Sequence, residues 1–390
     1  MSGDVLERLG FAERHLSAAA RTVFDELSHT LARDVVPLLA DAWDGATMPP
    51  EVIGALAPLG LMDPPGVEPG EADSSLFSGF RCFTLARADV SVATIYTAQA
   101  GLFRTTIRHG GTPEQVDEWD PLVRSFEKRG VFCLTEPDHG SDIAGGLATR
   151  ARREGDTWVI DGEKRWIGGA DAADVLAVFA RDEADGQVKA FLVDRHAPGV
   201  ELRIITGKVS LRPVQNAHIT LRGVRVAEER RLGGVNSWRD VAALLRRMRS
   251  DVAWIATGLQ AGALDAAIRY TTARQQFGRP LGGFQLVQEK LARMLGNTTS
   301  SLALVTALSA NQDAGTWSDE NSALAKMVTA ERARETAALA REVLGGNGLL
   351  LEHDAARFFA DAEAVYSYEG THEINALIVG RSLTGASAFA

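Results

Sequence analysis

Apolar residues recur at helical spacing through the first third of the chain, from Met1 to about Gly130. Segment 20–43 keeps apolar positions three and four residues apart, as one buried helix face requires. Segment 61–75 interrupts the pattern with clustered proline and glycine and is expected to be a loop. Residues 1–130 are therefore predicted to form an all-helical N-terminal domain.

The spacing of apolar residues changes toward every second position between residues 131 and 234. Five short runs rich in β-branched residues are separated by turn residues, and they are 157–162, 175–181, 188–194, 200–205 and 217–226. No helical pattern lies between them. Residues 131–234 are therefore predicted to form a small antiparallel β-barrel or sandwich.

Helical spacing returns after Gly234 and continues to the end of the chain. Ser237 can cap a long helix that has Asp240 in its first turn. Segment 318–346 begins with acidic residues and ends at two glycines, as the helix dipole and C-cap preferences favour. Long helices with short connections predict a C-terminal four-helix bundle over residues 235–390. The expected fold class is α+β and multidomain.

Composition limits the function classes. The chain has 390 residues, 45% of them hydrophobic, and a net charge of -10 that argues against nucleic acid and anionic membranes as partners. The two cysteines, Cys82 and Cys133, form no disulfide framework and no CxxC motif. There is no signal-peptide pattern and no apolar run of membrane-spanning length. A cytoplasmic protein is expected.

Two motifs in the predicted β region can approach a ligand closely. FCLTEPDHGSD, residues 132–142, is expected to be an irregular loop that exposes the hydroxyls of Thr135 and Ser141, and Gly140 would permit close approach. GEKRWIGGA, residues 162–170, places Trp166 before two glycines, where an indole ring could cover a planar cofactor. A core tryptophan and a plain turn are the structural alternatives.

Three further motifs lie in the C-terminal region. RQQFGRPLGGFQ spans residues 274–285 and LGGNGLL spans 344–350, and either could be a helix-ending turn or a cradle for phosphate or adenine. YEGTHEI spans 368–374 and places Glu369 between an aromatic ring and a glycine. Thr371 is expected to be the N-cap of the following helix. A GxGxxG motif between strand and helix is absent from the sequence, so a parallel dinucleotide-binding fold is not expected.

In this order and spacing, the motifs resemble the acyl-CoA dehydrogenase and oxidase family. TEPDHGSD, GKVSLRPVQN and YEGTHEINALIVGRSLTG are most similar to the glutaryl-CoA dehydrogenase and short-chain acyl-CoA oxidase branch. The resemblance covers nearly the whole chain and implies FAD as the cofactor, with no metal. It also implies a set of cofactor contacts, which are Phe132, Leu134, Thr135, Ser141, Trp166, Gly168, Arg274, Phe277, Gln285, Gly345, Gly346, Asn347, Gly348, Thr371 and Glu373.

The resemblance assigns Glu369 as the catalytic base. Such a carboxylate removes a proton from the carbon α to a thioester carbonyl, while the β hydrogen leaves as hydride to the flavin. An apolar pocket must raise the pKa of the glutamate for this task. The implied substrate contacts are Ser141, Arg249, Tyr368 and Gly370, although Arg249 could equally lie on a solvated basic helix face.

The resemblance also implies a homo-oligomer. Arg274, Gln285 and the turn 345–348 match positions that reach the FAD of a neighbouring subunit, which requires a dimer and fits a tetramer built as a dimer of dimers. The expected partners are an acyl-CoA or an acyl-carrier-protein thioester, and either an electron-accepting flavoprotein or O2.

Two departures from the family pattern bear on specificity. Glutaryl-specific relatives carry an arginine where this chain has Ala93, so a neutral acyl group is expected, unless Arg104 takes that role. Many dehydrogenases have threonine where this chain has Gly168, which could open space for oxygen or simply serve a turn with positive φ. The alternatives to a dehydrogenase are an acyl-CoA oxidase, a redox-neutral lyase or cyclase acting on a carrier-bound thioester, and a non-catalytic scaffold.

Overall fold

The computed structural model describes residue 6 and residues 9–316 and 318–386. The chain forms two compact units. The helical unit comprises residues up to Thr94, the short segment Val209–Pro213, and Arg249 onward, and the sheet unit comprises Ile95–Lys208 and Val214–Met248. The domain boundaries at residues 130 and 234 stay a prediction.

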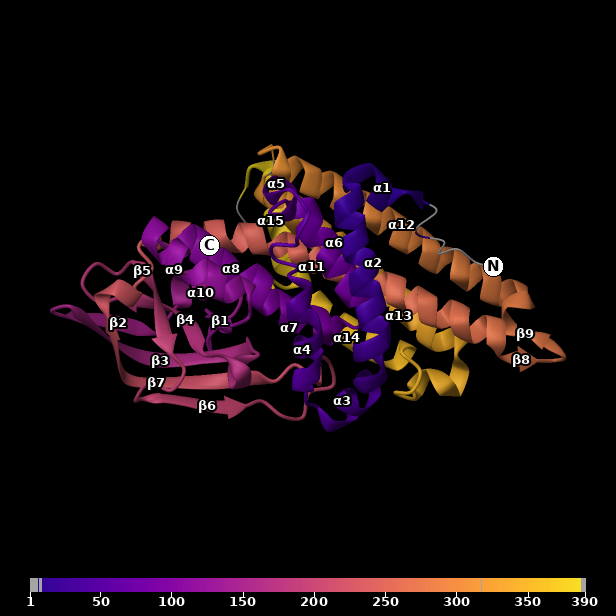
Figure 1. Cartoon of the computed structure of the whole chain (residues 1–390), viewed down its shortest axis with the longest axis horizontal. Coiled ribbons are helices and arrows are strands. Elements are labelled where there is room, and N and C mark those ends of the chain that lie inside the picture. The colour runs from indigo at the N-terminus through magenta and orange to yellow at the C-terminus, as the bar shows by residue number, and fades with distance from the viewer. Residues whose placement is uncertain (1–5, 7–8, 317, 387–390) are drawn as a thin grey trace. The chain divides into compact units, whose positions relative to one another are not determined.

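The helical unit begins with short helices and continues into a bundle of long ones (Figure 1). Its N-terminal elements are α1 (Phe11–His15), α2 (Ala18–Thr30), η2 (Leu31–Val35), η3 (Val36–Leu38), α3 (Leu39–Gly45), α4 (Pro50–Leu56), η4 (Ala57–Leu59), α5 (Pro69–Ala72), α6 (Ser75–Ala88) and the start of α7 (Val90–Thr97). Its C-terminal elements are most of α11 (Trp238–Ala273), the β8 (Gln275–Gln276) and β9 (Arg279–Pro280) hairpin, η8 (Leu281–Gly283), α12 (Gln285–Asp313), α13 (Asp319–Val343), η9 (Gly345–Leu349), α14 (Ala355–Ser367) and α15 (His372–Thr384).

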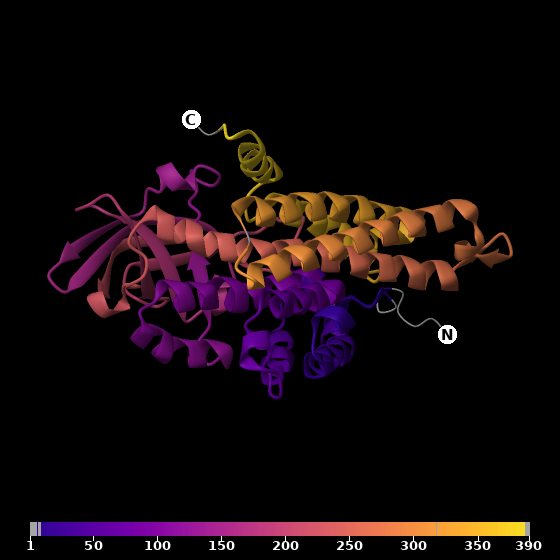
Figure 2. The same cartoon turned by 90° about the horizontal axis from the view of Figure 1, so that it is seen from above.

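Small and aromatic residues bring the helices of this unit close together. A Cβ placed on Gly79 of α6 would lie 2.2 Å from the Trp254 ring, so only glycine lets α6 pack this closely on α11. The Trp254 indole donates a hydrogen bond of 2.8 Å to Ser309 Oγ, which joins α11 to α12. α13 packs against α12, α14 and α15, and Figure 2 shows the long helices lying side by side. The long helices that the sequence predicted here are confirmed.

The sheet unit contains seven strands and the helices that cover them. Its elements are η5 (Ala98–Phe103), α8 (Arg104–Gly110), α9 (Pro113–Arg124), β1 (Gly130–Cys133), α10 (Ile143–Gly146), β2 (Arg150–Glu154), β3 (Thr157–Gly168), η6 (Ala170–Ala172), β4 (Val175–Asp182), β5 (Val188–Asp194), β6 (Val200–Ile204), β7 (Asn216–Ala227) and η7 (Glu228–Arg230). All five predicted strands are present. The helices join the core of the sheet through Phe103, Ile107 and Trp119, which are buried in one cluster with Leu134 and Phe179.

The sheet is mixed, which corrects the expectation of wholly antiparallel strands. Its order is β1-β4-β2-β3-β7-β6, with β5 paired to β4. β4 runs parallel to both β1 and β2, while the other neighbouring pairs are antiparallel. The sequence did not predict β1 and β2, because β1 is short and β2 (RARRE) buries only Ala151. Among the described residues, no helix combines the length and apolar character that crossing a membrane requires.

Candidate active site

Glu369 lies in a tight loop between α14 and α15. Its own φ is +56° and that of Gly370 is +88°, so two successive residues adopt left-handed backbone conformations. A residue with a Cβ rarely adopts this conformation, which costs about 1–2 kcal/mol unless its surroundings enforce it. Thr371 ends the loop as the N-cap of α15, because its hydroxyl accepts from the Ile374 N–H at 3.3 Å. The predicted cap is confirmed.

The environment of Glu369 favours its neutral form. Burial of the side chain raises the pKa of Glu369, and the negative charge of Asp251 raises it further, while Arg249 and Lys326 oppose this. Burial also raises the pKa of Asp251 to about 6, with Arg81 opposing the shift. A carboxyl group held above its ordinary pKa is better matched to proton abstraction near neutral pH. Arg249 therefore acts electrostatically on Glu369.

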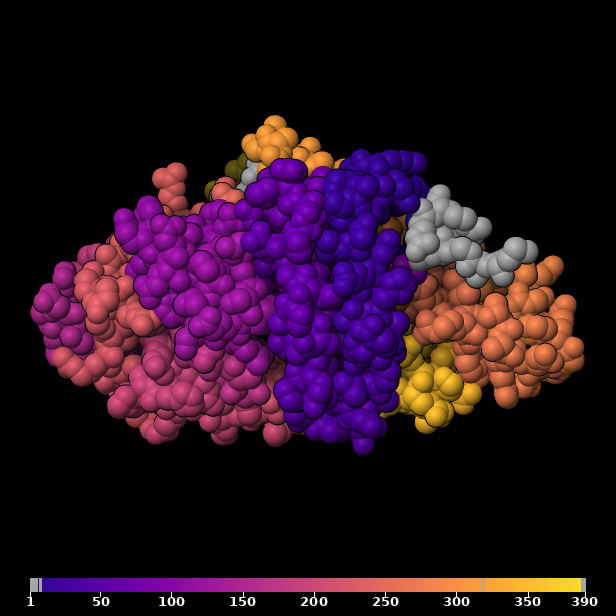
Figure 3. All heavy atoms as spheres, viewed as in Figure 1, coloured from indigo at the N-terminus to yellow at the C-terminus, as the bar shows by residue number. Residues whose placement is uncertain are grey.

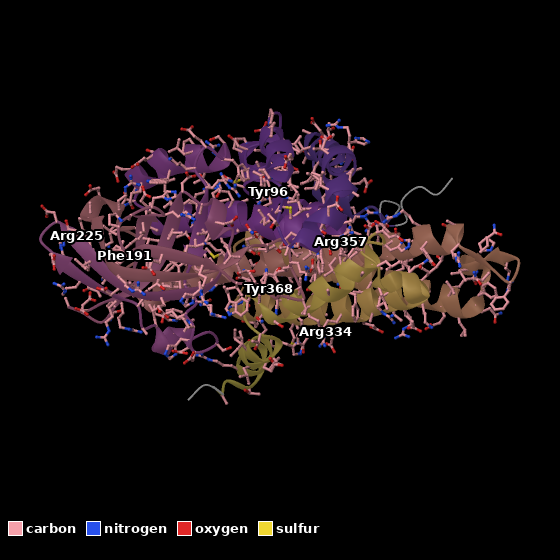
Figure 4. All side chains as sticks on the ribbon, turned by 90° about the horizontal axis from the view of Figure 1, so that it is seen from below. Tyr96, Phe191, Arg225, Arg334, Arg357 and Tyr368 are labelled. Atoms are coloured by element: carbon pink, nitrogen blue, oxygen red, sulfur yellow. The ribbon has the colours of Figure 1, made fainter. Side chains whose placement is uncertain are left out.

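Tyr368 precedes the loop glutamate and is the C-cap residue of α14 (Figure 4). The hydroxyl is buried, and desolvation together with the nearby Glu369 charge raises the pKa of this phenol. Thr94 and Cys82 lie close enough to affect the same hydroxyl. The neutral phenol of Tyr368 therefore offers a hydrogen-bonding group beside Glu369 without adding a charge.

Trp166 is displaced from the sheet by a bulge in β3. The register of β3 against β7 shifts between Lys164 and Ile167, and Trp166 has a φ of +66°. Trp166 is 53% exposed, although tryptophan is highly buried on average in folded proteins. The Asn216 side-chain amide donates to the Trp166 carbonyl at 3.1 Å and fixes the bulge. This excludes a core tryptophan. The Arg165 guanidinium lies over the ring, 5.2 Å from its centroid, and the exposed remainder of the indole can meet a ligand.

The start of the TEPDHGSD segment lies beside the same bulge. The Arg165 N–H donates to the Thr135 carbonyl at 2.8 Å. Phe132 is half-buried and its ring centroid lies 4.7 Å from that of Phe179. Ser141 is exposed. The Leu134 side chain, by contrast, is buried in the core, so only its backbone is placed to contact a cofactor.

A buried ion pair fixes this segment, and sequence reasoning missed it. Lys164 Nζ lies 2.7 Å from Glu136 Oε1, and both side chains are almost completely buried. The same ammonium donates to the Leu134 carbonyl at 3.1 Å, and Glu136 accepts from the backbone N–H groups of Ala148 and Thr149. The side chains of Glu136 and Lys164 thus hold the backbone of residues 134–136 in place.

Gly168 ends β3 and does not have positive φ, so the expected turn explanation is wrong; the left-handed residue is Gly169, with φ +76°. A Cβ at Gly168 would lie 3.3 Å from Val214 Cγ1 and 3.4 Å from Asn216 Nδ2. Local crowding therefore explains a glycine here without invoking open space.

The RQQFGRPLGGFQ motif forms a hairpin at one end of the helical unit, labelled β8 and β9 in Figure 1, and this end is exposed in the view of Figure 3. Arg274 and Gln285 are exposed, and Phe277 has a φ of +52° and is 93% exposed.

The GGNG turn lies at the same end of the bundle as the hairpin. The Asn347 side-chain amide donates at 2.8 Å to the hydroxyl of Tyr270, four residues before Arg274. Gly345 is left-handed, with φ +60°, and a Cβ at Gly348 would lie 2.2 Å from the Arg341 carbonyl oxygen. A Cβ built on Gly346 would meet nothing within 4 Å, so this position does not require glycine. Glu373 is exposed.

The comparisons with known proteins agree with the motifs. The chain matches the N-terminal, middle and C-terminal domain models of acyl-CoA dehydrogenase over residues 17–127, 131–224 and 238–384. It is 31% identical to the mitochondrial short-chain specific acyl-CoA dehydrogenase of Mus musculus over 357 residues, which cover 90% of this chain and 86% of that protein.

Solved structures share the fold over nearly the whole chain. Glutaryl-CoA dehydrogenase from Mycobacterium smegmatis superposes with a TM-score of 0.90 at 34% identity, with 98% of each chain covered. A glutaryl-CoA dehydrogenase from the same organism, in complex with FADH2, gives 0.91 at 30% identity, again with 98% of each chain covered. The chain belongs to the acyl-CoA dehydrogenase family, whose enzymes are oxidoreductases acting on CH–CH bonds.

The sheet unit fits a flavin. An exposed indole beside a fixed, half-buried strand end provides an aromatic face and backbone polar groups, which suit a planar heteroaromatic ring with polar edges. Within the helical unit, the exposed Arg274 supplies a positive charge that suits a diphosphate.

Proposed function

We propose that the protein is an FAD-dependent dehydrogenase that converts an acyl-CoA to its trans-2-enoyl thioester, with Glu369 as the base. The observation that carries the proposal is the raised pKa of Glu369 in a loop of enforced geometry. The cofactor is FAD, which accepts a hydride from the β-carbon when bound.

The chain's own residues prepare the acyl thioester for loss of its α-proton. Burial keeps the affinity of the Glu369 carboxylate for a proton high, and Arg249 keeps the ionised form accessible. The Glu369 N–H is the backbone donor that this family pattern directs at the thioester oxygen, where negative charge develops. Gly370 removes a side chain from the path of the acyl group.

Phe132, Thr135, Ser141, Trp166, Gly168 and the backbone of Leu134 would hold the flavin end of FAD. The remaining residues that the family resemblance implies as cofactor contacts, which are Arg274, Phe277, Gln285, Gly345–Gly348, Thr371 and Glu373, would contact FAD. Because the exposed hairpin is assigned to a neighbour's cofactor, the active form is a homo-oligomer, and a tetramer fits the family pattern. We place the enzyme in the cytoplasm, as its composition indicates.

A neutral acyl group is the favoured substrate. The position at which glutaryl-specific relatives carry arginine is Ala93, which is fully buried. Arg104 is unsuited to replace it, because its Nε lies 2.7 Å from Asp120 Oδ1 in the sheet unit. A buried substrate carboxylate without a cationic partner would be costly.

Anaerobic titration of the purified holoenzyme with short, branched and dicarboxylic acyl-CoA thioesters tests the proposal. Bleaching of the flavin by a neutral acyl-CoA, slow reoxidation in air and turnover with an artificial electron acceptor support a dehydrogenase. Reoxidation as fast as turnover, with stoichiometric peroxide, would indicate the oxidase. Product formation without bleaching would indicate the lyase or cyclase. The relatives named above are acyl-CoA dehydrogenases, which supports the dehydrogenase over these alternatives.

A further inference from the structure

Lys326 of α13 is a completely buried lysine that bonds to both ends of the loop carrying Glu369. Its ammonium donates to the Tyr366 carbonyl at 2.6 Å and to the Gly370 carbonyl at 2.8 Å. Tyr366 lies in the last turn of α14, where carbonyl groups lack helical partners and where the helix dipole favours a cation. The Lys326 ammonium therefore donates hydrogen bonds both to a carbonyl at the C-terminal end of α14 and to a carbonyl of the turn that follows it.

Asn375, which is also completely buried, holds the same loop. Its side-chain amide donates to the carbonyls of Gly370 and Thr371, both at 2.9 Å. The Tyr366 ring stacks on His372, with centroids 4.8 Å apart and planes inclined by 12°. Each contact joins residues on opposite sides of Glu369 or fixes one of its neighbours.

These contacts explain how Glu369 keeps a left-handed backbone. A non-glycine residue with positive φ persists when its surroundings over-determine it, and such strain is typical of functional sites. A bond from a buried ammonium to a carbonyl is stronger than a neutral one, and leaving either group unpaired would be costly. The Lys326 ammonium therefore makes two charge-assisted hydrogen bonds that help to hold the loop in this conformation.

We propose that Lys326 is a positioning residue for the base: its ammonium fixes the loop 366–370 so that the Glu369 carboxylate and N–H face the acyl thioester. The proposal rests on the assignment of Glu369 as the base. Lys326 touches neither the substrate nor the cofactor in this account. It acts through the backbone and through its charge.

The charge of Lys326 also acts on the pKa of Glu369, which an uncharged side chain with the same backbone contacts would not do. The charged groups that face Glu369 are Arg249 and Asp251 from α11 and Lys326 from α13, while Glu373 of α15 faces Lys326. The ammonium lowers the pKa of Glu369. Burial lowers the pKa of Lys326 itself to about 8, so the group remains largely charged at neutral pH.

The test compares Lys326→Met and Lys326→Gln with the wild-type holoenzyme. Met removes the charge and the donors, whereas Gln removes the charge but keeps an N–H donor. Thr329→Val is the matched control, because Thr329 is a buried polar residue on the same helix that bonds only within α13 through its hydroxyl, to Ala325. FAD content, circular dichroism and thermal midpoint establish that each variant is folded and loaded.

Hydrogen–deuterium exchange of the peptide covering 366–375 is the readout that does not depend on catalysis. Lys326→Met is expected to raise exchange there by roughly tenfold or more, Lys326→Gln by less, and Thr329→Val not at all. kcat should fall by roughly ten- to a hundredfold in Lys326→Met with little change in KM, since small misplacements of a base are costly. The acid limb of the pH profile should move to higher pH in both Lys326 variants, because each loses a cation that lowers the pKa of Glu369.

Unchanged exchange in this peptide, or an unshifted acid limb in both variants, would overturn the proposal. If Lys326→Met does not fold, Lys326→Gln decides by the same measurements. The outcome is separable from the proposed function: an active Glu369→Gln enzyme would remove the base assignment, while loosened exchange at 366–375 would still show that Lys326 orders the loop.

Discussion

The side-chain amide nitrogen of Asn375 lies 2.9 Å from the Gly370 carbonyl and would lie 3.3 Å from a Cβ built on Gly370. The hydrogen bond and the absence of a side chain are thus parts of one arrangement. Any larger residue at 370 must push Asn375 away and adopt a φ of +88°.

Gly370→Ala is therefore expected to distort the loop that carries Glu369. The strain of about 1–2 kcal/mol for a left-handed alanine should be relieved by movement of the loop, lowering kcat by roughly tenfold or more while FAD stays bound. Single-turnover flavin reduction measures this. Gly296→Ala is the control, because Gly296 is in the interior of α12 with open space around it. Equal rates in Gly370→Ala and wild type would contradict the role of the turn.

Asp251→Asn should move the acid limb of kcat/KM to lower pH. Asp251 has a pKa near 6, so it is mostly ionised at neutral pH, and its charge raises the pKa of Glu369. Removing that charge lowers the pKa of Glu369, and the active carboxylate then forms at lower pH. A pH series with one saturating and one limiting substrate concentration checks the shift. An acid limb that stays in place or moves upward would show that Asp251 does not act on the base.

Arg274→Ala should weaken FAD retention by roughly ten- to a hundredfold, the effect of losing one charge-assisted hydrogen bond. The ratio of flavin to protein after gel filtration, combined with sedimentation, measures retention and assembly together. Arg293→Ala is the control, since Arg293 is an exposed arginine of α12 paired with Glu335. A wild-type monomer with full FAD occupancy would show that no neighbouring subunit is needed.

Neutral short or branched acyl-CoA should have a higher kcat/KM than glutaryl-CoA. The reason is that Ala93 offers no charge and Arg104 is engaged by Asp120. Initial rates with matched chain lengths provide the comparison. A clear preference for glutaryl-CoA would mean that another cation meets the distal carboxylate.

Much of this arrangement follows from the sequence, and the remainder depends on tertiary contacts. The periodicity predicted the long helices and five strands, because their apolar faces are regular. It missed β2, whose residues are mostly exposed, and the parallel pairing of β4, which depends on non-local contacts. The sequence motif around Glu369 identified the candidate base, but no motif identified Lys326 as a residue that positions it. A lysine in ALAKMV is one charge in an apolar helix face, and only the fold reveals the carbonyls that it meets.

The most direct test of the central claim is flavin reduction by acyl-CoA in the Glu369→Gln holoenzyme. The substitution keeps the shape of the side chain and removes the base. With FAD content equal to that of the wild type, the rate of anaerobic flavin bleaching by the best neutral acyl-CoA should fall by roughly a hundred- to ten-thousandfold. Bleaching at the wild-type rate in a folded, FAD-loaded Glu369→Gln protein would contradict the account.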